Sequence, residues 1–204
     1  MRNKRGWPAM MGGLLLIAAA LCLTAYNIWD EGHAAAAADS AVRQLDAEIR
    51  ETVEATPPEA LPDYVAAPEM EMPTVEIDGH TYIGRLSIPA LELSLPVMSD
   101  WSYSDLKLSP CRYSGSVYQD DMVIAAHNYT RHFGRLRRLK PGSQVVFTDV
   151  DGNQFSYAVT ELEQLGPADV EEMVTGDWDL TLFTCTLGGR SRITVRCERQ
   201  AAAG

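Results

Sequence analysis

The chain has 204 residues, and its 17 lysines and arginines against 28 aspartates and glutamates give a formal net charge of −11. Its length fits one domain with appendages, while 46% hydrophobic and 22% charged residues exclude a wholly disordered chain or a collagen-like fibre. The acidic balance argues against a nucleic-acid partner, because phosphate backbones require a basic surface. None of the four cysteines is in C-x-x-C spacing, which argues against a disulfide scaffold and a Cys-based zinc or redox motif.

The N-terminal part of the chain is apolar and free of charge over residues 6–29. A helix of about 20 residues crosses a bilayer, so this segment is long enough to span one. Basic residues within 1–5 precede it and Asp30 and Glu31 follow, so the positive-inside rule places residues 1–5 in the cytoplasm and the rest of the chain outside. The alternative is a cleaved signal peptide, with small-residue cleavage sites in 34–38. We favour an uncleaved, single-pass anchor in the cell membrane, because the apolar segment is longer than a usual signal sequence.

Residues 30–73 are expected to connect this anchor to a folded domain. Within them, 39–54 carries apolar residues at spacings of three and four, which is typical of a short amphipathic helix. This helix would serve as a stalk by default, or as a self-association stripe or a packing element. Five prolines in 56–73 predict an extended, semi-rigid linker, and residues 74–204 then form the folded domain.

The domain of residues 74–204 consists mostly of short predicted strands. The Asp-Gly pairs at 78–79 and 151–152, flanked by alternating apolar and polar residues, predict two hairpins. Short helical segments are expected at 133–139 and 167–174. Further strands are expected at 85–97, 121–126, 180–184 and 193–197. Seven or eight short strands with few helices predict an all-β fold, a closed or nearly closed β-barrel.

A cysteine and a histidine each stand at the end of a predicted buried strand. Cys185 precedes a polar, glycine-containing loop, 186–191, where a side chain is rigidly held yet reachable. His127 ends its strand in the same way, and such a pair is the minimal arrangement for a thiol nucleophile with a proton-transfer partner. Arg190 and Arg192 follow closely, and each offers a permanent cation for a developing oxyanion. On spacing alone, a buried and inert Cys185 is equally open.

The residues around Cys185 resemble those of a known enzyme family. Residues 181–185, Thr-Leu-Phe-Thr-Cys, are similar to the Thr-Leu-x-Thr-Cys motif of the sortases, the cysteine transpeptidases of Gram-positive cell surfaces. The order His, Cys, Arg is also that of the family, and the resemblance covers about residues 74–199. Further similar stretches are 84–89, 95–97, 114–116, 123–127 and 192–195.

The resemblance implies an eight-stranded sortase-type β-barrel in which His127, Cys185 and Arg192 converge on a groove. It implies that Cys185 attacks the Thr–Gly bond of a Leu-Pro-x-Thr-Gly (LPXTG) type signal at the C-terminus of an exported protein. His127 would protonate the leaving amine, and the thioester would pass to an amine of a peptidoglycan precursor or a pilin. Arg192 would hold the substrate and stabilise the oxyanion, while Thr184 would shape the substrate pocket. Neither a metal nor a cofactor is expected.

Two assignments within this resemblance stay open. Arg192 is preferred because it directly precedes the strand-like Ile-Thr-Val, yet strand alternation places Arg190 on the same face. The short interval between His127 and Cys185 and the lack of an Asp-Pro-Trp lid sequence leave the sortase subclass unassigned.

Several other features have ordinary structural explanations. His132 and His127 are spaced like a ligand pair, but a surface histidine is the favoured interpretation. Residues 149–160 begin like a calcium loop, but a hairpin turn is favoured because the glycine is misplaced and position 12 is threonine. The basic cluster in 131–140 predicts a solvated helix face, with contact to anionic wall polymer or lipid headgroups as the alternative.

A disulfide is a further hypothesis for two of the cysteines. Cys111 and Cys197 both lie outside the membrane, where a disulfide between them is chemically allowed.

Two other functional classes remain open for a chain with an exported cysteine and histidine. One is another Cys/His peptidase or hydrolase of the cell wall, and the other is a membrane-tethered binding module in which Cys185 is inert.

Overall fold

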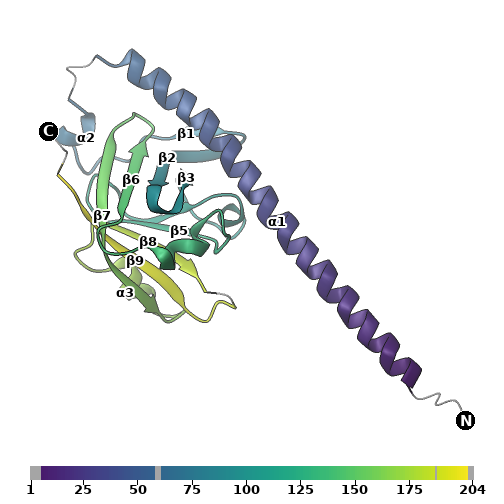
Figure 1. Cartoon of the computed structure of the whole chain (residues 1–204). Coiled ribbons are helices and arrows are strands. Elements are labelled where there is room, and N and C mark those ends of the chain that lie inside the picture. Colours follow the sequence, from purple (N-terminus) through teal and green to yellow (C-terminus); the bar gives the residue numbers. More distant parts are fainter. Residues whose placement is uncertain (1–5, 58–60, 187, 202–204) are drawn as a thin grey trace, which may run out of the picture.

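The computed structural model describes residues 6–57, 61–186 and 188–201, and Figure 1 shows a β-barrel with one long helix along its side. The cytoplasmic segment expected at 1–5 lies outside the described residues. The described part begins with helix α1 (Gly6–Ala55), which has 50 residues and no break. Residues 33–55 are rich in alanine and other strong helix formers, so the helix expected at 39–54 is the continuation of the apolar one. It ends before Pro57, because proline disfavours helical conformation at the residue before it.

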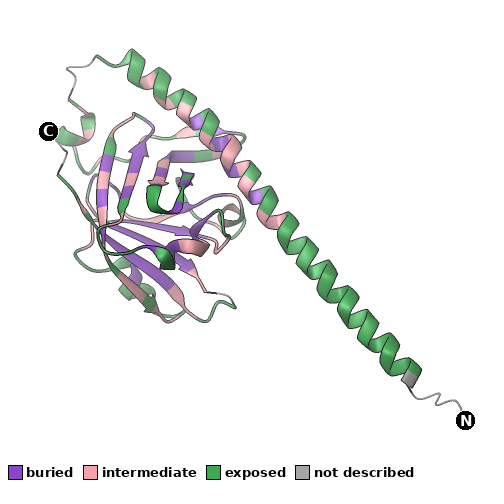
Figure 2. Cartoon of the chain, viewed as in Figure 1, coloured by how far each residue is buried: buried purple, intermediate pink, exposed green. Residues whose placement is uncertain are grey.

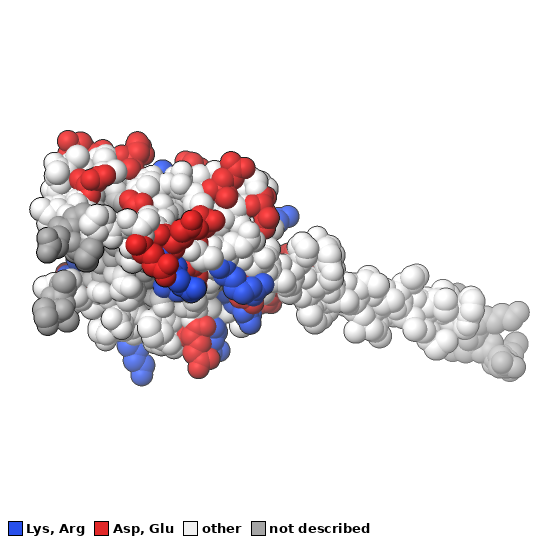
Figure 3. Space-filling view, turned by 90° about the horizontal axis from the view of Figure 1, so that it is seen from above, with Lys and Arg blue, Asp and Glu red and all other residues white. Residues whose placement is uncertain are grey.

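The first half of α1 projects away from the barrel with its apolar side chains exposed. Leu15, Leu16 and Ile17 are 61–74% exposed, and the projecting part carries no charged side chain in Figure 3. By length and composition, this helix can cross a membrane. The N-terminal apolar helix is therefore a candidate membrane anchor.

The second half of α1 packs against the barrel (Figure 2). Ala34, Ala38, Ala41 and Leu45 follow one another at spacings of four, three and four, and each is at most 5% exposed. Ala38 joins the main core together with Met72, and Leu45 joins a second apolar cluster. Of the three roles considered for this amphipathic stretch, the structure shows a packing element.

The described residues form nine strands joined in one sheet, whose order is β1-β2-β3-β4-β5-β8-β9-β7-β6. Strand β6 also pairs with β2, so β2 to β9 close into an eight-stranded barrel and β1 extends β2 as a hairpin. The predicted all-β, eight-stranded barrel is therefore confirmed. The strands are β1 (Val75–Ile77), β2 (His80–Ile88), β3 (Leu93–Met98), β4 (Cys111–Ser114), β5 (Met122–Ala126), β6 (Gln144–Asp149), β7 (Gln154–Leu165), β8 (Leu180–Cys185) and β9 (Arg192–Arg199).

The connections are short and mostly follow the turn signals in the sequence. Asp78 and Gly79 both have positive φ (51° and 78°), as a tight two-residue hairpin requires, so the predicted hairpin between β1 and β2 is confirmed. The single run expected at 85–97 is instead divided between β2 and β3. Pro89 starts a 3₁₀ turn and Glu92 has a left-handed backbone (φ 52°), which reverses the chain. Short helical elements complete the domain: α2 (Asp63–Ala66), η1 (Pro89–Leu91), η2 (Asp105–Lys107), η3 (Phe133–Arg138) and α3 (Val170–Val174).

The hypothesis of a disulfide between Cys111 and Cys197 is wrong. Both thiols are free and fully buried, and they belong to different apolar clusters. Cys111 lies on β4 and Cys197 on β9, which are separated in the sheet by β5 and β8. A disulfide needs Cα atoms within about 7 Å, and three strand spacings of about 4.8 Å exceed that distance.

Candidate active site

The sheet register brings the three predicted catalytic residues to one end of the barrel. Strands β5 and β8 are parallel, with Ala126 opposite Thr184, so His127 and Cys185 are the next residues on neighbouring strands. Strands β8 and β9 are antiparallel, and Cys185 is paired with Arg192. Because neighbouring strands lie about 5 Å apart, residues 58 positions apart in sequence become adjacent at this edge.

Thr184 joins the two central strands just before the site. It is 3% exposed, and its hydroxyl donates a hydrogen bond of 2.7 Å to the carbonyl oxygen of Ala126. This bond holds β8 to β5 one residue before Cys185 and His127 on their respective strands. Thr184 also borders the cavity at Cys185, but its hydroxyl is already engaged with backbone.

Cys185 is half-buried and opens into a cavity of about 350 Å³. Its lining includes two buried apolar residues, Phe133 and Ile193, and two basic residues, Arg137 and Arg138. Both arginines are exposed, and neither forms a hydrogen bond or ion pair with other described residues. Among the described residues, the cavity is lined by Asn128, Thr130, Phe133, Gly134, Arg137, Arg138, Thr184, Cys185, Thr186 and Ile193.

The arginines of the basic cluster 131–140 have different surroundings. Arg131 forms an ion pair with Asp39 of α1, and Arg135 donates hydrogen bonds to two backbone carbonyl oxygens. Arg137 and Arg138 instead line the cavity at Cys185. The sequence showed a basic helix face but not its position, because the turn that carries these arginines to Cys185 depends on the fold.

Arg192 is held beside Cys185 by the loop that joins β8 to β9. Its Nη1 donates to the carbonyl oxygens of Gly189 and Ser191, each at 3.3 Å. Arg190 is exposed and forms no hydrogen bond or ion pair within the described part of the chain. The structure therefore places Arg192, rather than Arg190, opposite the cysteine in the strand register.

The environment of His127 favours its neutral form. Burial lowers the pKa of His127 below its usual 6.5, and the Lys107 ammonium lowers it further, whereas the Asp30 carboxylate raises it. A neutral imidazole near pH 7 can accept a proton from a thiol. Its position next to Cys185 therefore suits a general base.

The prediction that His132 lies on the surface is wrong. Its side chain is 0% exposed, and neither ring nitrogen has a hydrogen-bond partner among the described residues. The loop folds inward because the next residue, Phe133, is anchored in the core. Burial, followed by the nearby His127, lowers the pKa of His132 to about 4.

This buried histidine predicts acid sensitivity. The unfolded chain binds a proton at His132 near pH 6.5 and the folded chain only near pH 4, so stability falls as pH decreases across this window. The free energy of unfolding of the wild type should fall between pH 7 and pH 4.5. We expect that fall to be about 2.5 kcal/mol smaller in His132→Phe. Denaturant titrations of the full chain at both pH values measure this, with His33→Phe at an exposed position as control. An equal acid loss in wild type and His132→Phe would contradict the burial of a neutral ring.

Comparisons with known proteins agree with this geometry. A family model described as "Sortase domain" matches residues 86–200, more than half of the chain. Sortase A of Bacillus anthracis is 29% identical over 158 residues, which cover 71% of this chain and 70% of that relative.

Solved structures show the same architecture. Sortase C1 from Streptococcus suis matches with a TM-score of 0.52 and 27% identity, over 60% of this chain and 75% of that one. Clostridium perfringens sortase C, whose structure was determined with the C-terminal cell wall sorting motif, matches with a TM-score of 0.53 and 23% identity, over 80% and 91%. The register of His, Cys and Arg, the barrel and the family match lead to one conclusion: the chain belongs to the sortase family of transpeptidases.

Proposed function

We propose that His127, Cys185 and Arg192 are the catalytic residues of this sortase. The observation that carries the proposal is the strand register. Cys185 is paired with Arg192 across β8 and β9. Ala126 is paired with Thr184 across β5 and β8, so the residues that follow them, His127 and Cys185, are neighbours. A nucleophile, a base and a permanent cation at one barrel edge are the groups that acyl transfer needs.

The proposed reaction proceeds in two acyl transfers. His127 takes the proton of the Cys185 thiol, and the sulfur attacks the substrate carbonyl carbon to form a tetrahedral oxyanion beside the Arg192 guanidinium. The C–N bond then breaks, His127 returns its proton to the departing amine, and a thioester remains on Cys185. An incoming amine attacks the thioester and gives its proton to His127, and the Cys185 thiolate leaves.

The proposed substrate is an exported protein with an LPXTG-like sorting signal near its C-terminus. Family membership supports this, and a related solved structure was determined with a sorting motif. The acceptor is an amine of a peptidoglycan precursor or a pilin. Phe133 and Ile193 in the lining of the cavity at Cys185 offer apolar surface for aliphatic side chains of such a peptide.

We further propose that α1 anchors the enzyme in the cell membrane of a Gram-positive bacterium, with the barrel outside. The exposed apolar half of α1 supports this, and so does the position of its first acidic residues. Asp30 and Glu31 already contact the loop that follows His127. The catalytic edge then faces the membrane surface, where a substrate still tethered by its C-terminal segment would present its sorting signal.

The function is tested with the full chain in detergent micelles, because α1 contributes to the barrel core. The enzyme is incubated with a panel of sorting-signal peptides and triglycine, and products are identified by mass spectrometry. A peptide cut before its glycine and joined to triglycine supports the proposal. Hydrolysis without transfer, or no cleavage of any peptide, would contradict it.

The two arginines of the β8–β9 connection provide a matched pair. We expect Arg192→Ala to lower kcat/KM by roughly 10²- to 10³-fold, as loss of an oxyanion donor does. Arg190→Ala should change kcat/KM less than about threefold, because its side chain is exposed and forms no hydrogen bond or ion pair with the described residues. Peptide cleavage followed by chromatography measures both. The reverse ranking would transfer the oxyanion role to Arg190.

A further inference from the structure

The loop that follows His127 is attached to helix α1 at three consecutive residues. The Tyr129 hydroxyl donates to Asp30 at 2.5 Å, and the Thr130 amide donates to Glu31 at 2.5 Å. The Arg131 guanidinium donates to both carboxylate oxygens of Asp39 at 2.9 and 3.0 Å. All three acceptors are acidic side chains of α1, so they attach this loop to the helix.

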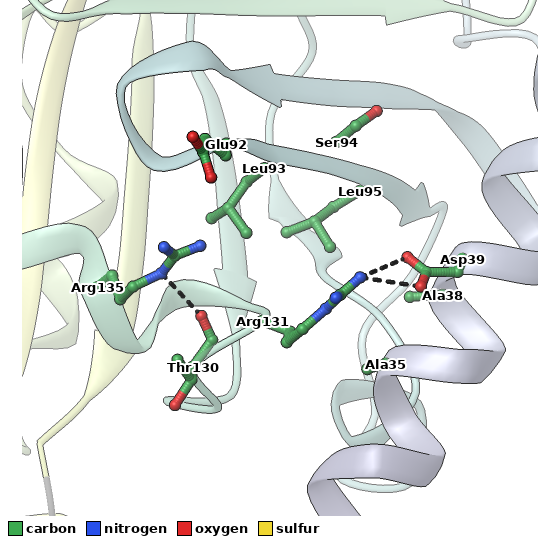
Figure 4. Close-up of a pocket in the computed structure, with 10 residues that line it drawn as sticks. All are labelled: Ala35, Ala38, Asp39, Glu92, Leu93, Ser94, Leu95, Thr130, Arg131 and Arg135. Carbon is green, nitrogen blue, oxygen red and sulfur yellow. Dashed lines mark hydrogen bonds and ion pairs between the residues drawn. The ribbon is translucent and has the colours of Figure 1, made fainter.

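Figure 4 shows the last of these contacts at a cavity of about 320 Å³ between α1 and the barrel. Arg131 reaches across to Asp39, while Ala35 and Ala38 form the helical side. Thr130 borders this cavity and also the cavity at Cys185. The loop 128–132 therefore separates the cavity at helix α1 from the cavity at Cys185.

Tyr129 connects helix α1 to His127. Its ring lies 4.9 Å from the His127 ring, centroid to centroid, with 38° between the planes, and 5.5 Å from the His132 ring. Its hydroxyl is bound to Asp30 at the other end. Two rotatable bonds fix a tyrosine side chain once its ring is packed and its hydroxyl is bound, so Tyr129 can restrict the orientation of His127.

We propose that Tyr129 is a positioning residue for His127, held in place by Asp30 of the N-terminal helix. The inference rests on the proposed function, in which His127 moves the proton. Helix α1 is then part of the active site as well as a candidate anchor. Asp30 is the first charged residue after the apolar segment 6–29, so the residue that ends the apolar segment also holds Tyr129.

The charge of Asp30 gives this arrangement a second effect. The ionisable groups near His127 are Asp30 on α1, Lys107 on η2, Tyr129 and His132 in its own loop, and Cys185 and Arg192 on the adjoining strands. Among them, Asp30 raises the pKa of His127, whereas Lys107 lowers it. Removing the negative charge therefore disfavours the imidazolium and moves the pKa of His127 to a lower value.

The test compares Tyr129→Phe, Asp30→Ala, their double variant and Asp30→Asn in the full chain in micelles. Asp46→Ala and Asp46→Asn are the matched controls. Asp46 also lies on α1, but its carboxylate pairs with the Arg85 guanidinium of β2 (Nη1 to Oδ1, 3.1 Å) and forms no hydrogen bond or ion pair with the loop 128–132. We expect Tyr129→Phe and Asp30→Ala each to lower kcat roughly tenfold or more with KM within about twofold, because His127 is misplaced while the cavity is intact. The double variant should lose no more than the larger single loss, and the Asp46 variants should match the wild type.

A readout that needs no substrate separates this inference from the proposed function. NMR titration of ¹³Cε1-labelled histidines, assigned with His127→Ala, follows the pKa of His127 directly. We expect Asp30→Asn to lower that pKa and Asp46→Asn to leave it unchanged. If the wild type cleaves no peptide but the His127 titration changes in both Asp30→Asn and Tyr129→Phe, the proposed function fails and the Asp30–Tyr129 link stands. A His127 titration that is unchanged in Tyr129→Phe, or additive kinetic losses in the double variant, would overturn the link.

Discussion

Replacing Cys185 by alanine is expected to abolish transpeptidation, with a loss in kcat on the order of 10⁴-fold or more, because Cys185 is the only thiol at this barrel edge among the described residues. Removing one sulfur from a half-buried strand end should leave the thermal unfolding midpoint of the full chain nearly unchanged. The measurement is product formation from a cleaved peptide, followed together with the unfolding transition.

The chain supplies its own controls for this variant. Cys22 is an exposed thiol in the apolar half of α1, the half that projects away from the barrel, so Cys22→Ala should keep full activity. Cys111 and Cys197 are buried, and burial raises the pKa of each thiol to about 12, so neither forms a thiolate at neutral pH. Residual activity of Cys185→Ala above a few per cent of the wild type would contradict the assignment of the nucleophile.

The second large effect is expected at His127. Without the imidazole, the thiol loses its base and the leaving amine loses its acid, so His127→Ala should lower kcat/KM by about 10²- to 10⁴-fold. The matched control is His33→Ala, at an exposed position of α1. Peptide cleavage assays across pH measure both variants.

The pH profile adds a directional test of the same residue. Because the pKa of His127 is lowered, its neutral form persists below pH 6.5. On the acid side, kcat/KM should therefore begin to decrease only at pH values below 6.5. His127→Ala should remove this decrease from whatever activity remains. An acid limb above pH 6.5, or one that persists in His127→Ala, would show that another group is the base.

The local elements followed from the sequence because their signals are local. The Asp-Gly turn at 78–79 and the strand before Cys185 needed only nearby residues, and the structure confirms both. The proximity of His127, Cys185 and Arg192 is long-range. It was inferred from a family resemblance, and the β5–β8–β9 register now gives it a physical basis.

Features that depend on tertiary contacts could not be read in the same way. The apolar spacing around Leu45 was visible, but its partner, the apolar cluster with Ile77 and Tyr82, lies more than 30 residues away. A surface position was expected for His132 because no acidic or cysteine cluster in the sequence supports a metal site there, whereas its burial depends on Phe133 entering the core. The closure of the barrel by β2 and β6 likewise has no local signal.

The most direct test of the central claim is the mass of the enzyme during turnover. The full chain is mixed with a cleavable sorting-signal peptide without an acceptor amine, quenched in acid and measured intact, and the adduct is then located by proteolytic mapping. The account predicts a mass increase equal to the N-terminal peptide fragment, attached at Cys185 and released on addition of triglycine. Cleavage without any adduct on Cys185, or an adduct on another residue, would contradict it.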